Sequence, residues 1–404
     1  MESRGLAKQL VHISALAVLI STNLAVGASG PPSPPGMSTQ AIPSGSFHGV
    51  EIPPLWIYDI EAPRDGLHHS GVIVGQDPFT GAGPQEVPTY IVPLVVVVHS
   101  MVQTYDPKTG LVTTVPGLWV FDPTAPNPAC LSSPNDIPIQ LVEQSPLFQN
   151  VPLSFGGTNV GSTQYFDAFE RASFWRVPGV SVSYHVMLNP AVTLAPIVID
   201  APANEALWEP AIITGLSSKC APAGYIDANW LDSYLNGTVL PSLTAQGVSP
   251  SSFTLFVFAD ITPAGSPVTN YNLPFFSYHT THAQPLLTQM YAVTTFDSEQ
   301  GTDIEVMTHE IAEAMNDPLG PNKTPPWAFP AGYPFPGCSS SYEVGDPLNG
   351  IPTRRIPITM QNGYTYHVQE LAFFSWFFGG PSLGVNGWFS NYGTFTSDAG
   401  ALCP

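Results

Sequence analysis

His309, Glu310 and Glu313 are the residues whose types and spacing are best suited to chemistry, and they form the pattern H-E-x-x-E. Residues four apart lie on the same face of a helix, so His309 and Glu313 can bind one ion together. Imidazole nitrogen and carboxylate oxygen are both ligands of Zn²⁺. Glu310 lies beside that face and is the candidate catalytic residue, as a general base toward a metal-bound water.

The pattern differs by one residue from the H-E-x-x-H helix of zinc hydrolases. Glu313 places an anion where that motif has a neutral histidine, which lowers the Lewis acidity of a bound metal and weakens the argument for a peptidase. The change also favours a harder divalent ion than Zn²⁺. The alternative to a metal site is an ordinary helix face with a His–Glu contact. The motif therefore indicates metal binding more strongly than it indicates any one reaction.

A metal site needs a third ligand, and the downstream segment YEVGDP supplies two candidates, Glu343 and Asp346. His279 and His282 precede the expected helix, and either could border a cleft and hydrogen-bond a substrate carbonyl or oxyanion. His367 is a candidate of the same kind. For these three histidines the alternative is a structural or surface role.

The segment that must position the motif, residues 302–318, is expected to form a single helix. Thr302 and Glu305 match the S/T-x-x-E capping box at its start, and Pro318 should end it one or two residues earlier. Asp317 is a weaker ligand candidate because the helix ends there. Apolar residues lie roughly opposite the motif: Ile304, Met307, Ile311 and Ala314. Burial of this stripe would turn the motif toward a cleft.

Three apolar segments precede this helix and are expected to be strands, at residues 252–259, 276–280 and 290–296. Residues 89–98 are β-branched on both faces, which predicts a central strand covered on both sides. Further strands are expected at 55–60, 71–74, 118–121, 137–142, 181–188, 194–199 and 364–374, and helices at 162–175 and 227–235. This mixture predicts a loop-rich α+β fold.

The chain has 404 residues, with only 10 Lys and Arg against 30 Asp and Glu, for a formal net charge of −20. So few basic residues argue against nucleic-acid binding, which needs a basic footprint, and against adhesion to anionic membranes. The 45 Pro and 35 Gly indicate many turns, whereas a hydrophobic content of 44% is enough for a core.

Residues 1–28 have the features of a secretory signal: a short basic region, an apolar run and small residues at the cleavage site. An N-terminal membrane anchor is the alternative, and the short apolar run disfavours it. Residues 29–46 are expected to be a Pro/Ser/Gly linker. Residues 47–404 are expected to be one domain, with a β-rich part at 47–160 and a metal-site core at 161–404. We therefore expect a secreted, periplasmic or extracellular protein that leaves the membrane after signal cleavage.

The four cysteines are Cys130, Cys220, Cys338 and Cys403. In an exported chain they favour two disulfides, for which three pairings are possible. Pairing within each half of the chain, Cys130–Cys220 and Cys338–Cys403, is the arrangement we favour. A cysteine metal site is disfavoured because no C-x-x-C pair is present.

The segments THEIAEAMNDP, YEVGD and NGYTYHVQELAFFSW resemble a group of uncharacterised secreted bacterial proteins with a predicted zincin-like metal site. That group has SHEIAEAxTDP, EIGDxC and a strand with VQ before aromatic residues, and the likeness covers blocks within residues 89–404. A shorter part is distantly similar to plant phosphate-induced, exordium-like extracellular proteins. The resemblance implies a zincin-like mixed sheet with an active-site helix, but no substrate. Where the group has a cysteine after EIGD, this chain has Pro347-Leu348, so Cys338 would take over the bond to Cys403.

These patterns together predict a secreted metal-dependent hydrolase of the peptidase kind, acting on a peptide or protein. His309, Glu313 and either Glu343 or Asp346 would hold Zn²⁺ or another divalent ion, with Glu310 as the base. The alternative is a non-catalytic extracellular or cell-surface binding protein with a structural or vestigial metal site. A carbohydrate-active protein that uses paired carboxylates has only the composition in its favour. The substrate and the oligomeric state stay open.

Overall fold

The computed structural model describes residues 36–42, 45–47, 50–80, 83–105, 109, 112–126, 136–209, 223–265, 277–284, 287–298, 302–320, 322–330, 337–349, 354–398 and 403. The expected signal at residues 1–28 lies outside this part of the chain, as do Cys130 and Cys220. None of the described helices is both long enough and apolar enough to cross a membrane.

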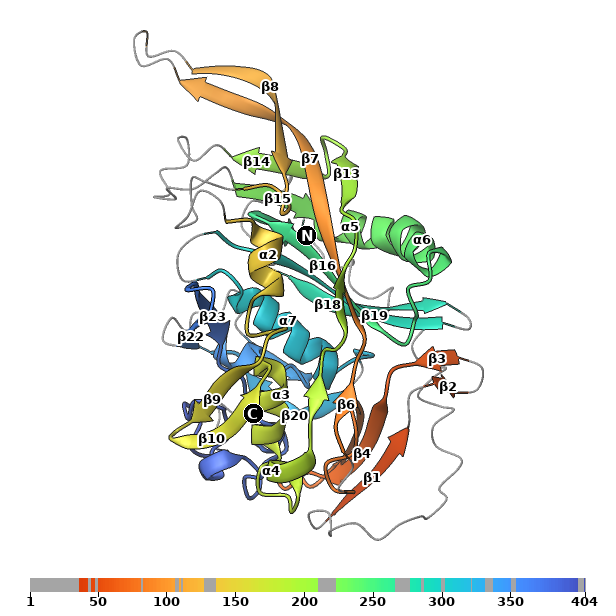
Figure 1. Cartoon of the computed structure of the whole chain (residues 1–404), viewed down its shortest axis with the longest axis vertical. Coiled ribbons are helices and arrows are strands. Elements are labelled where there is room, and N and C mark those ends of the chain that lie inside the picture. Colours follow the sequence, from red (N-terminus) through yellow and green to blue (C-terminus); the bar gives the residue numbers. More distant parts are fainter. Residues whose placement is uncertain are drawn as a thin grey trace.

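A nine-stranded sheet forms the centre of the described chain (Figure 1). Its middle strands are β7 (Thr89–Tyr105), β16 (Phe253–Ala259) and β19 (Leu287–Phe296), which run parallel to one another. The other strands of this sheet are β2 (Gly45–Phe47), β3 (Val50–Ile52), β8 (Val112–Phe121), β12 (Ala191–Thr193), β13 (Ile197–Ala201) and β18 (Tyr278–Gln284). At one end, β7 and β8 extend away from the rest of the molecule as a long antiparallel pair.

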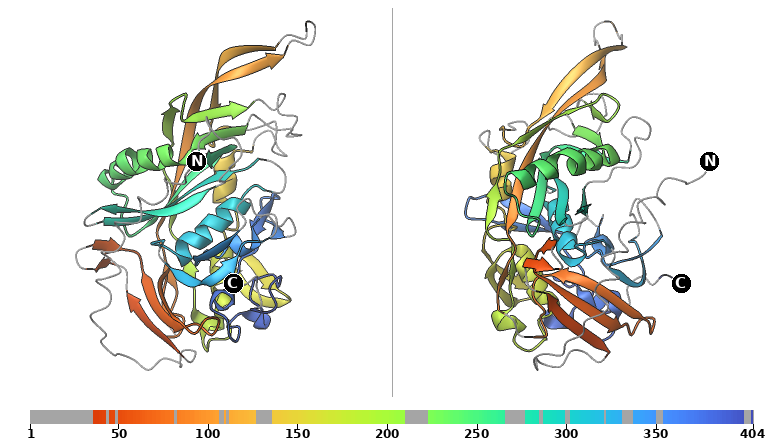
Figure 2. Two further views of the ribbon diagram at one scale, coloured as in Figure 1. Left: turned by 180° about the vertical axis from the view of Figure 1, so that it is seen from behind. Right: turned by 90° about the vertical axis from the view of Figure 1, so that its right-hand side faces the viewer.

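Both faces of the central sheet are covered, as the continuous apolar runs predicted. Every residue of β16 is buried, and its alternate side chains enter two separate apolar cores. Phe253 and Leu255 pack in one core with α7 (Glu305–Asn316), whereas Phe256 packs in the other core beside the helical segment that follows β15. That segment consists of α5 (Ala228–Tyr234), η2 (Leu235–Val239) and α6 (Leu240–Ala245). Figures 1 and 2 show α7 on one side of the sheet and α5 and α6 on the other.

Smaller sheets surround this centre. One contains β1 (Met37–Ile42), β4 (Leu55–Glu61) and β5 (His68–Val74), and another contains β14 (Ala206–Glu209), β15 (Ala223–Asp227) and β17 (Ile261–Ala264). The paired strands are β6 (Gln85–Glu86) with β11 (Val186–Met187), β9 (Val151–Phe155) with β10 (Thr158–Thr163), β20 (Lys323–Ala328) with β21 (Cys338–Ser341), and β22 (Arg355–Thr359) with β23 (Thr365–Gln369). The remaining helices are α2 (Pro138–Glu143), α3 (Tyr165–Ser173), α4 (Val180–Ser183), α8 (Phe374–Phe378) and the 3₁₀ turns η3 (Asp346–Leu348) and η5 (Val385–Gly387). The chain is thus a mixed helix and strand protein, as expected.

Some segments differ from the expected secondary structure. The expected strand at residues 181–188 begins instead within the short helix α4, and only Val186–Met187 of it form a strand. Residues 137–142, expected as a strand, contain α2, because Pro138 occupies the first helical turn and the apolar residues Pro138, Leu141 and Val142 follow helical spacing. Residues 37–42, expected within a linker, form the edge strand β1. Its side chains are mostly exposed, so its pairing with β4 rests on backbone hydrogen bonds and leaves little hydrophobic pattern in the sequence.

The start of α7 also differs from expectation, whereas its end does not. The Thr302 hydroxyl donates to Asp297 at 2.7 Å and caps no helix, so the expected capping box is wrong. The helix begins three residues later, after Ile304, whose N–H donates to the Asp303 carboxylate at 2.8 Å. It ends at Asn316, as Pro318 predicted.

A disulfide joins Cys338 to Cys403, with their Cα atoms 5.9 Å apart, which confirms one of the two favoured pairings. The bond links β21, directly before the YEVGDP segment, to the end of the chain. Cys130 and Cys220 lie outside the described residues, so their pairing stays a prediction.

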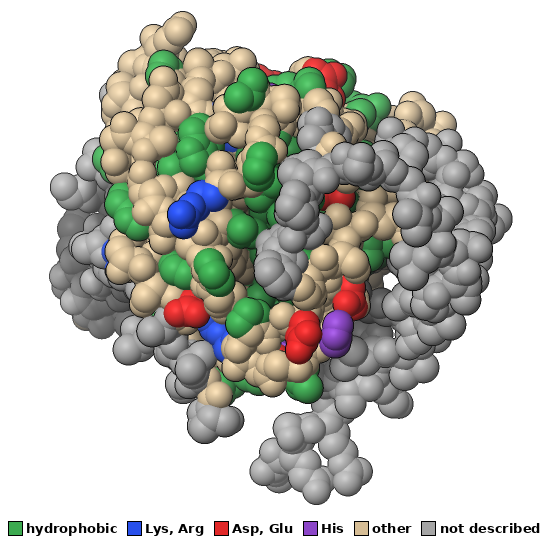
Figure 3. All heavy atoms as spheres, turned by 90° about the horizontal axis from the view of Figure 1, so that it is seen from below, with side chains coloured by type: hydrophobic (Ala, Val, Ile, Leu, Met, Phe, Trp, Pro, Cys, Tyr) green, Lys and Arg blue, Asp and Glu red, His purple; other side chains and the backbone are tan. Residues whose placement is uncertain are grey.

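Figure 3 shows one face of the molecule, on which uncharged side chains predominate. The described Lys and Arg side chains on this face are scattered and form no continuous patch there. This distribution agrees with the small number of basic residues in the sequence.

Candidate metal centre

Helix α7 brings His309, Glu310 and Glu313 into the interior of the molecule. Their side chains are only 8%, 8% and 5% exposed, respectively. The apolar side chains on the other face, such as Met307 and Ile311, are fully buried in the core. Both faces of the helix are therefore enclosed, and polar groups enclosed in this way need partners.

The first group of potential ligands joins the helix to the YEVGDP segment. His309 Nε2 lies 3.1 Å from Glu313 Oε2 and 3.5 Å from Asp346 Oδ1. Ligand atoms bound at about 2.1 Å in a tetrahedral site lie roughly 3.4 Å from one another. The three donors are imidazole and carboxylate groups at about this spacing, so they fit a divalent ion. Asp346, one of the two predicted third ligands, occupies this position.

Gln369 fixes the orientation of the His309 ring. Its side-chain amide donates to the carbonyl oxygen of Gly345 at 2.6 Å, which leaves Gln369 Oε1 facing His309 Nδ1 at 3.1 Å. Because an amide oxygen can only accept, Nδ1 carries a proton in either charge state of the ring, and Nε2 is the nitrogen that can offer its lone pair to a metal. Sequence reasoning missed Gln369 as a site residue, although the VQ of its strand was part of the observed resemblance.

Glu313 is held so that one of its oxygens is available to an ion. Its Oε1 accepts the backbone N–H groups of Gly345 and Asp346 at 3.0 and 3.2 Å. Its Oε2 is the atom that faces His309. Gly345 lies directly against the imidazole, and a Cβ atom there would stand 2.4 Å from His309 Nδ1. Only glycine permits this close approach of the turn to the helix.

Buried neighbours position the YEVGDP segment. Tyr342 and Val344 are fully buried, whereas Glu343 between them is only half-buried. The Tyr342 N–H donates to the carbonyl oxygen of Asn322 at 3.1 Å, and the Ala372 N–H donates to that of Val344 at 2.8 Å. Because side chains alternate along this segment, Glu343 points away from the aromatic core and toward the metal-ligand candidates.

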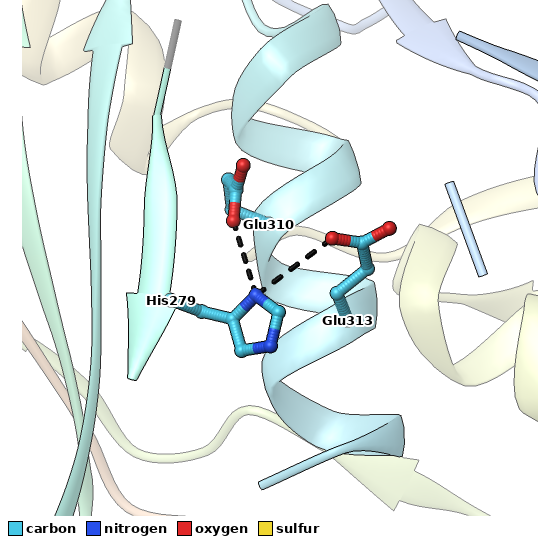
Figure 4. Close-up of side chains that lie close together, drawn as sticks. All are labelled: His279, Glu310 and Glu313. Carbon is cyan, nitrogen blue, oxygen red and sulfur yellow. Dashed lines mark hydrogen bonds and ion pairs between the residues drawn. The ribbon is translucent and has the colours of Figure 1, made fainter. Parts of the chain in front are cut away.

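The second group of potential ligands joins α7 to β18. His279 Nδ1 lies 3.2 Å from Glu310 Oε2 and 3.7 Å from Glu313 Oε2 (Figure 4). The other oxygen of Glu310 accepts the Ser277 hydroxyl at 2.6 Å. His279 Nε2 lies 3.7 Å from Glu343 Oε2, so the second predicted carboxylate faces this histidine instead of His309. His279, expected at a cleft border, thus lies among the ligand candidates.

Opposing charges determine the pKa values in this cluster when no metal is bound. Burial alone would lower the pKa of His279, but Glu343, Glu310 and Glu313 together raise it to about 10. Burial likewise opposes the effect of Glu313 on His309, and the carboxylates raise the pKa of His309 well above its usual value. Metal-free histidines therefore hold protons that a metal ion must displace.

The carboxylates respond in opposite directions. Burial would raise the pKa of Glu310, but His279 and His309 lower it. Burial and the neighbouring acidic groups raise the pKa of Glu313 well above its usual value, against the effect of His309. Asp317 is fully buried, and its Oδ2 has no hydrogen-bond partner among the described residues. Burial, followed by the charge of Glu343, raises the pKa of Asp317 to about 8.

Of the remaining predicted histidines, His367 does not join these groups. The His367 N–H donates to Asp303 at 2.8 Å, and its ring Nδ1 lies 3.3 Å from the same carboxylate, so it anchors β23 to the start of α7. His282 belongs to β18, but its side chain lies outside the described part of the chain.

Comparison of the sequence with family models and with curated proteins, and of the structure with solved structures, found no match. The likeness to secreted zincin-like proteins therefore stays a prediction. Any function assigned to the centre rests on the residues of this chain alone.

Proposed function

We propose that this chain is a secreted metal-dependent hydrolase of the peptidase kind with a zincin-like active-site helix. The observation that carries the proposal is the convergence of His309 Nε2, Glu313 Oε2 and Asp346 Oδ1. Hydrogen bonds to the other nitrogen of His309 and the other oxygen of Glu313 leave the two converging atoms available. Ligands of protein-bound metals are typically oriented by such hydrogen bonds.

A divalent ion held there would lower the pKa of a bound water and polarise a carbonyl group. In a site with one ion, Glu310 would accept the proton of the attacking water and pass it to the leaving group. Its position in the second group of potential ligands and beside the first, with Ser277 fixing one oxygen, suits this role. A peptide or protein is the substrate class that this chemistry favours, with Zn²⁺ or a harder divalent ion.

One observation favours the alternative, a non-catalytic extracellular binding protein with a structural ion. The ligand candidates on α7 are at most 8% exposed, whereas a catalytic ion keeps a position open to water and substrate. Under this alternative, removal of the metal would lower stability, and no peptide or ester would be hydrolysed.

The test begins with the metal content of the purified full-length chain, measured by mass spectrometry after loading with Zn²⁺ or Mn²⁺ and removal of excess ion. We expect bound metal that His309→Ala diminishes and that His367→Ala leaves unchanged. The loaded protein is then assayed on a library of fluorogenic peptides, with and without a chelator. Chelator-sensitive cleavage supports the hydrolase. Bound metal without turnover of any peptide or ester supports the binding protein, and absence of bound metal contradicts both.

A further inference from the structure

Glu313 belongs to two groups of potential ligands at once, and this points beyond a single ion. Its Oε2 faces His309 Nε2 on one side, at 3.1 Å, and His279 Nδ1 on the other, at 3.7 Å. We infer that the centre holds two divalent ions that share Glu313, one with His309 and Asp346 and the other with His279 and Glu310. This inference rests on the proposed metal site and adds a second ion to it.

The second group matches the first in donor types and spacing. It contains one imidazole nitrogen and two carboxylate oxygens, as the first group does, and within each group the donor atoms all lie within 4.8 Å of one another. His279 Nδ1 and Glu310 Oε2 are 3.2 Å apart, close to the roughly 3.4 Å expected between tetrahedral ligands. Figure 4 shows that the His279 ring projects from β18 toward both carboxylates of α7.

Each histidine has an oxygen atom near its remote nitrogen, but only the one at His309 lies at hydrogen-bond distance. Gln369 Oε1 faces Nδ1 of His309 at 3.1 Å, and Glu343 Oε2 faces Nε2 of His279 at 3.7 Å. A carboxylate or carbonyl group at the remote nitrogen selects the tautomer whose other nitrogen binds a metal. The His309 imidazole is thus oriented by a hydrogen bond, whereas the remote nitrogen of His279 has an ion-pair contact with Glu343.

The charge of the cluster favours two ions over one. Its four carboxylates come from α7 and the YEVGDP segment: Glu310, Glu313, Glu343 and Asp346. Two divalent ions bound with both histidines neutral balance all four carboxylates, whereas one ion with His279 still protonated leaves one negative charge uncompensated in a buried site. Uncompensated buried charge is costly.

The inference changes the role of Glu310. Its two oxygens are already directed, one to Ser277 and one to His279, which suits a ligand better than a base that must face a water. In sites with two metals, both the attacking and the leaving oxygen of a displacement can be stabilised. Glu310→Gln separates the roles, because loss of a base leaves the metal content unchanged, whereas loss of a ligand lowers it.

The test is the number of ions per chain, determined by native mass spectrometry of the full chain loaded with Zn²⁺, with circular dichroism to verify folding. We expect two ions in the wild type and one each in Glu310→Gln, His279→Ala and Asp346→Asn. Mn²⁺-loaded wild type should show the electron paramagnetic resonance signal of a coupled pair, which the single-ion variants lack. His367→Ala, outside the cluster, should keep both ions.

The outcomes separate the two proposals. One ion in the wild type, unchanged in Glu310→Gln and His279→Ala, overturns the second ion and leaves the proposed metal site standing. Two ions that persist in both of these variants place the second ion elsewhere and also overturn the inference. If the wild type binds no ion, the proposed function fails together with the inference.

Discussion

Replacement of Gly345 by alanine perturbs the contact on which the centre depends most closely. The added Cβ would stand 2.4 Å from Nδ1, 2.7 Å from Cγ and 2.8 Å from Cε1 of His309, whereas ordinary contacts lie at 3.4–4 Å. The imidazole and the turn must therefore separate by about 1 Å. Since the Gly345 N–H also binds Glu313, that movement disturbs two ligands of one ion.

The expected loss has two parts. Overpacking in a buried site costs about 1–3 kcal/mol of folding stability. Loss of ligand orientation lowers metal affinity about 10–100-fold. Competition with a chromophoric chelator measures the affinity, and urea unfolding in the presence of a chelator measures the stability of the metal-free chain.

Gly237→Ala is the matched control. A Cβ atom added at Gly237 would meet no neighbouring side chain of the described residues within 4 Å, and Gly237 lies in the helical segment η2, so alanine is accommodated there. This variant should keep the wild-type metal affinity. If Gly345→Ala binds metal as tightly as the wild type and unfolds at the same urea concentration, the conclusion that the turn packs tightly against His309 is wrong.

Further predictions concern the metal centre and two other parts of the chain. Gln369→Leu leaves the His309 ring unoriented and should weaken metal binding about 10–100-fold by the same chelator competition, and unchanged affinity would contradict the role of Gln369. Because His279 must lose its proton to bind a metal, the apparent metal affinity should rise with pH below about 10, by about tenfold per pH unit for each displaced proton. Calorimetry at several pH values measures this affinity, and a constant affinity would refute the prediction. Burial raises the pKa of Glu170 from 4.5 to about 8. Between these two pH values the folded chain retains a proton that the unfolded chain has lost, so the free energy of unfolding falls by up to roughly 4 kcal/mol as the pH rises from about 5 to about 8.5. Urea unfolding at pH 5 and 8.5 should show a smaller fall in stability in Glu170→Gln than in the wild type. An equal fall in both proteins would contradict the role of Glu170. The double variant Cys338→Ser, Cys403→Ser removes a disulfide that closes a sequence separation of 65 residues, so it should lower the stability by about 2–4 kcal/mol in the same urea assay. An unchanged urea midpoint would show that the bond does not stabilise the fold.

Local patterns in the sequence predicted the parts of the site that lie close together along the chain. The spacing of four between His309 and Glu313 places them on one helix face, and the structure brings Nε2 and Oε2 to 3.1 Å. The choice between Glu343 and Asp346 could not be made from the sequence. The turn at Gly345 and the burial of Val344 decide which carboxylate faces which histidine.

Contacts between distant segments were beyond local patterns. His279 reaches the centre because β18 pairs with β19, and Gln369 does so because β23 lies along α7. Neither arrangement leaves a periodic signal near these residues. The failed capping box has a similar cause, since the Thr302 hydroxyl donates to Asp297, and the Glu305 carboxylate accepts from the side chain of Arg355, which is 50 residues away in the sequence.

The most direct test of the metal centre is a crystal structure of the Zn²⁺-loaded full chain with anomalous diffraction at the zinc edge. We predict an anomalous peak within about 2.0–2.2 Å of His309 Nε2, Glu313 Oε2 and Asp346 Oδ1. A structure without a peak there, in which His309 still contacts Glu313 directly, would contradict the metal centre.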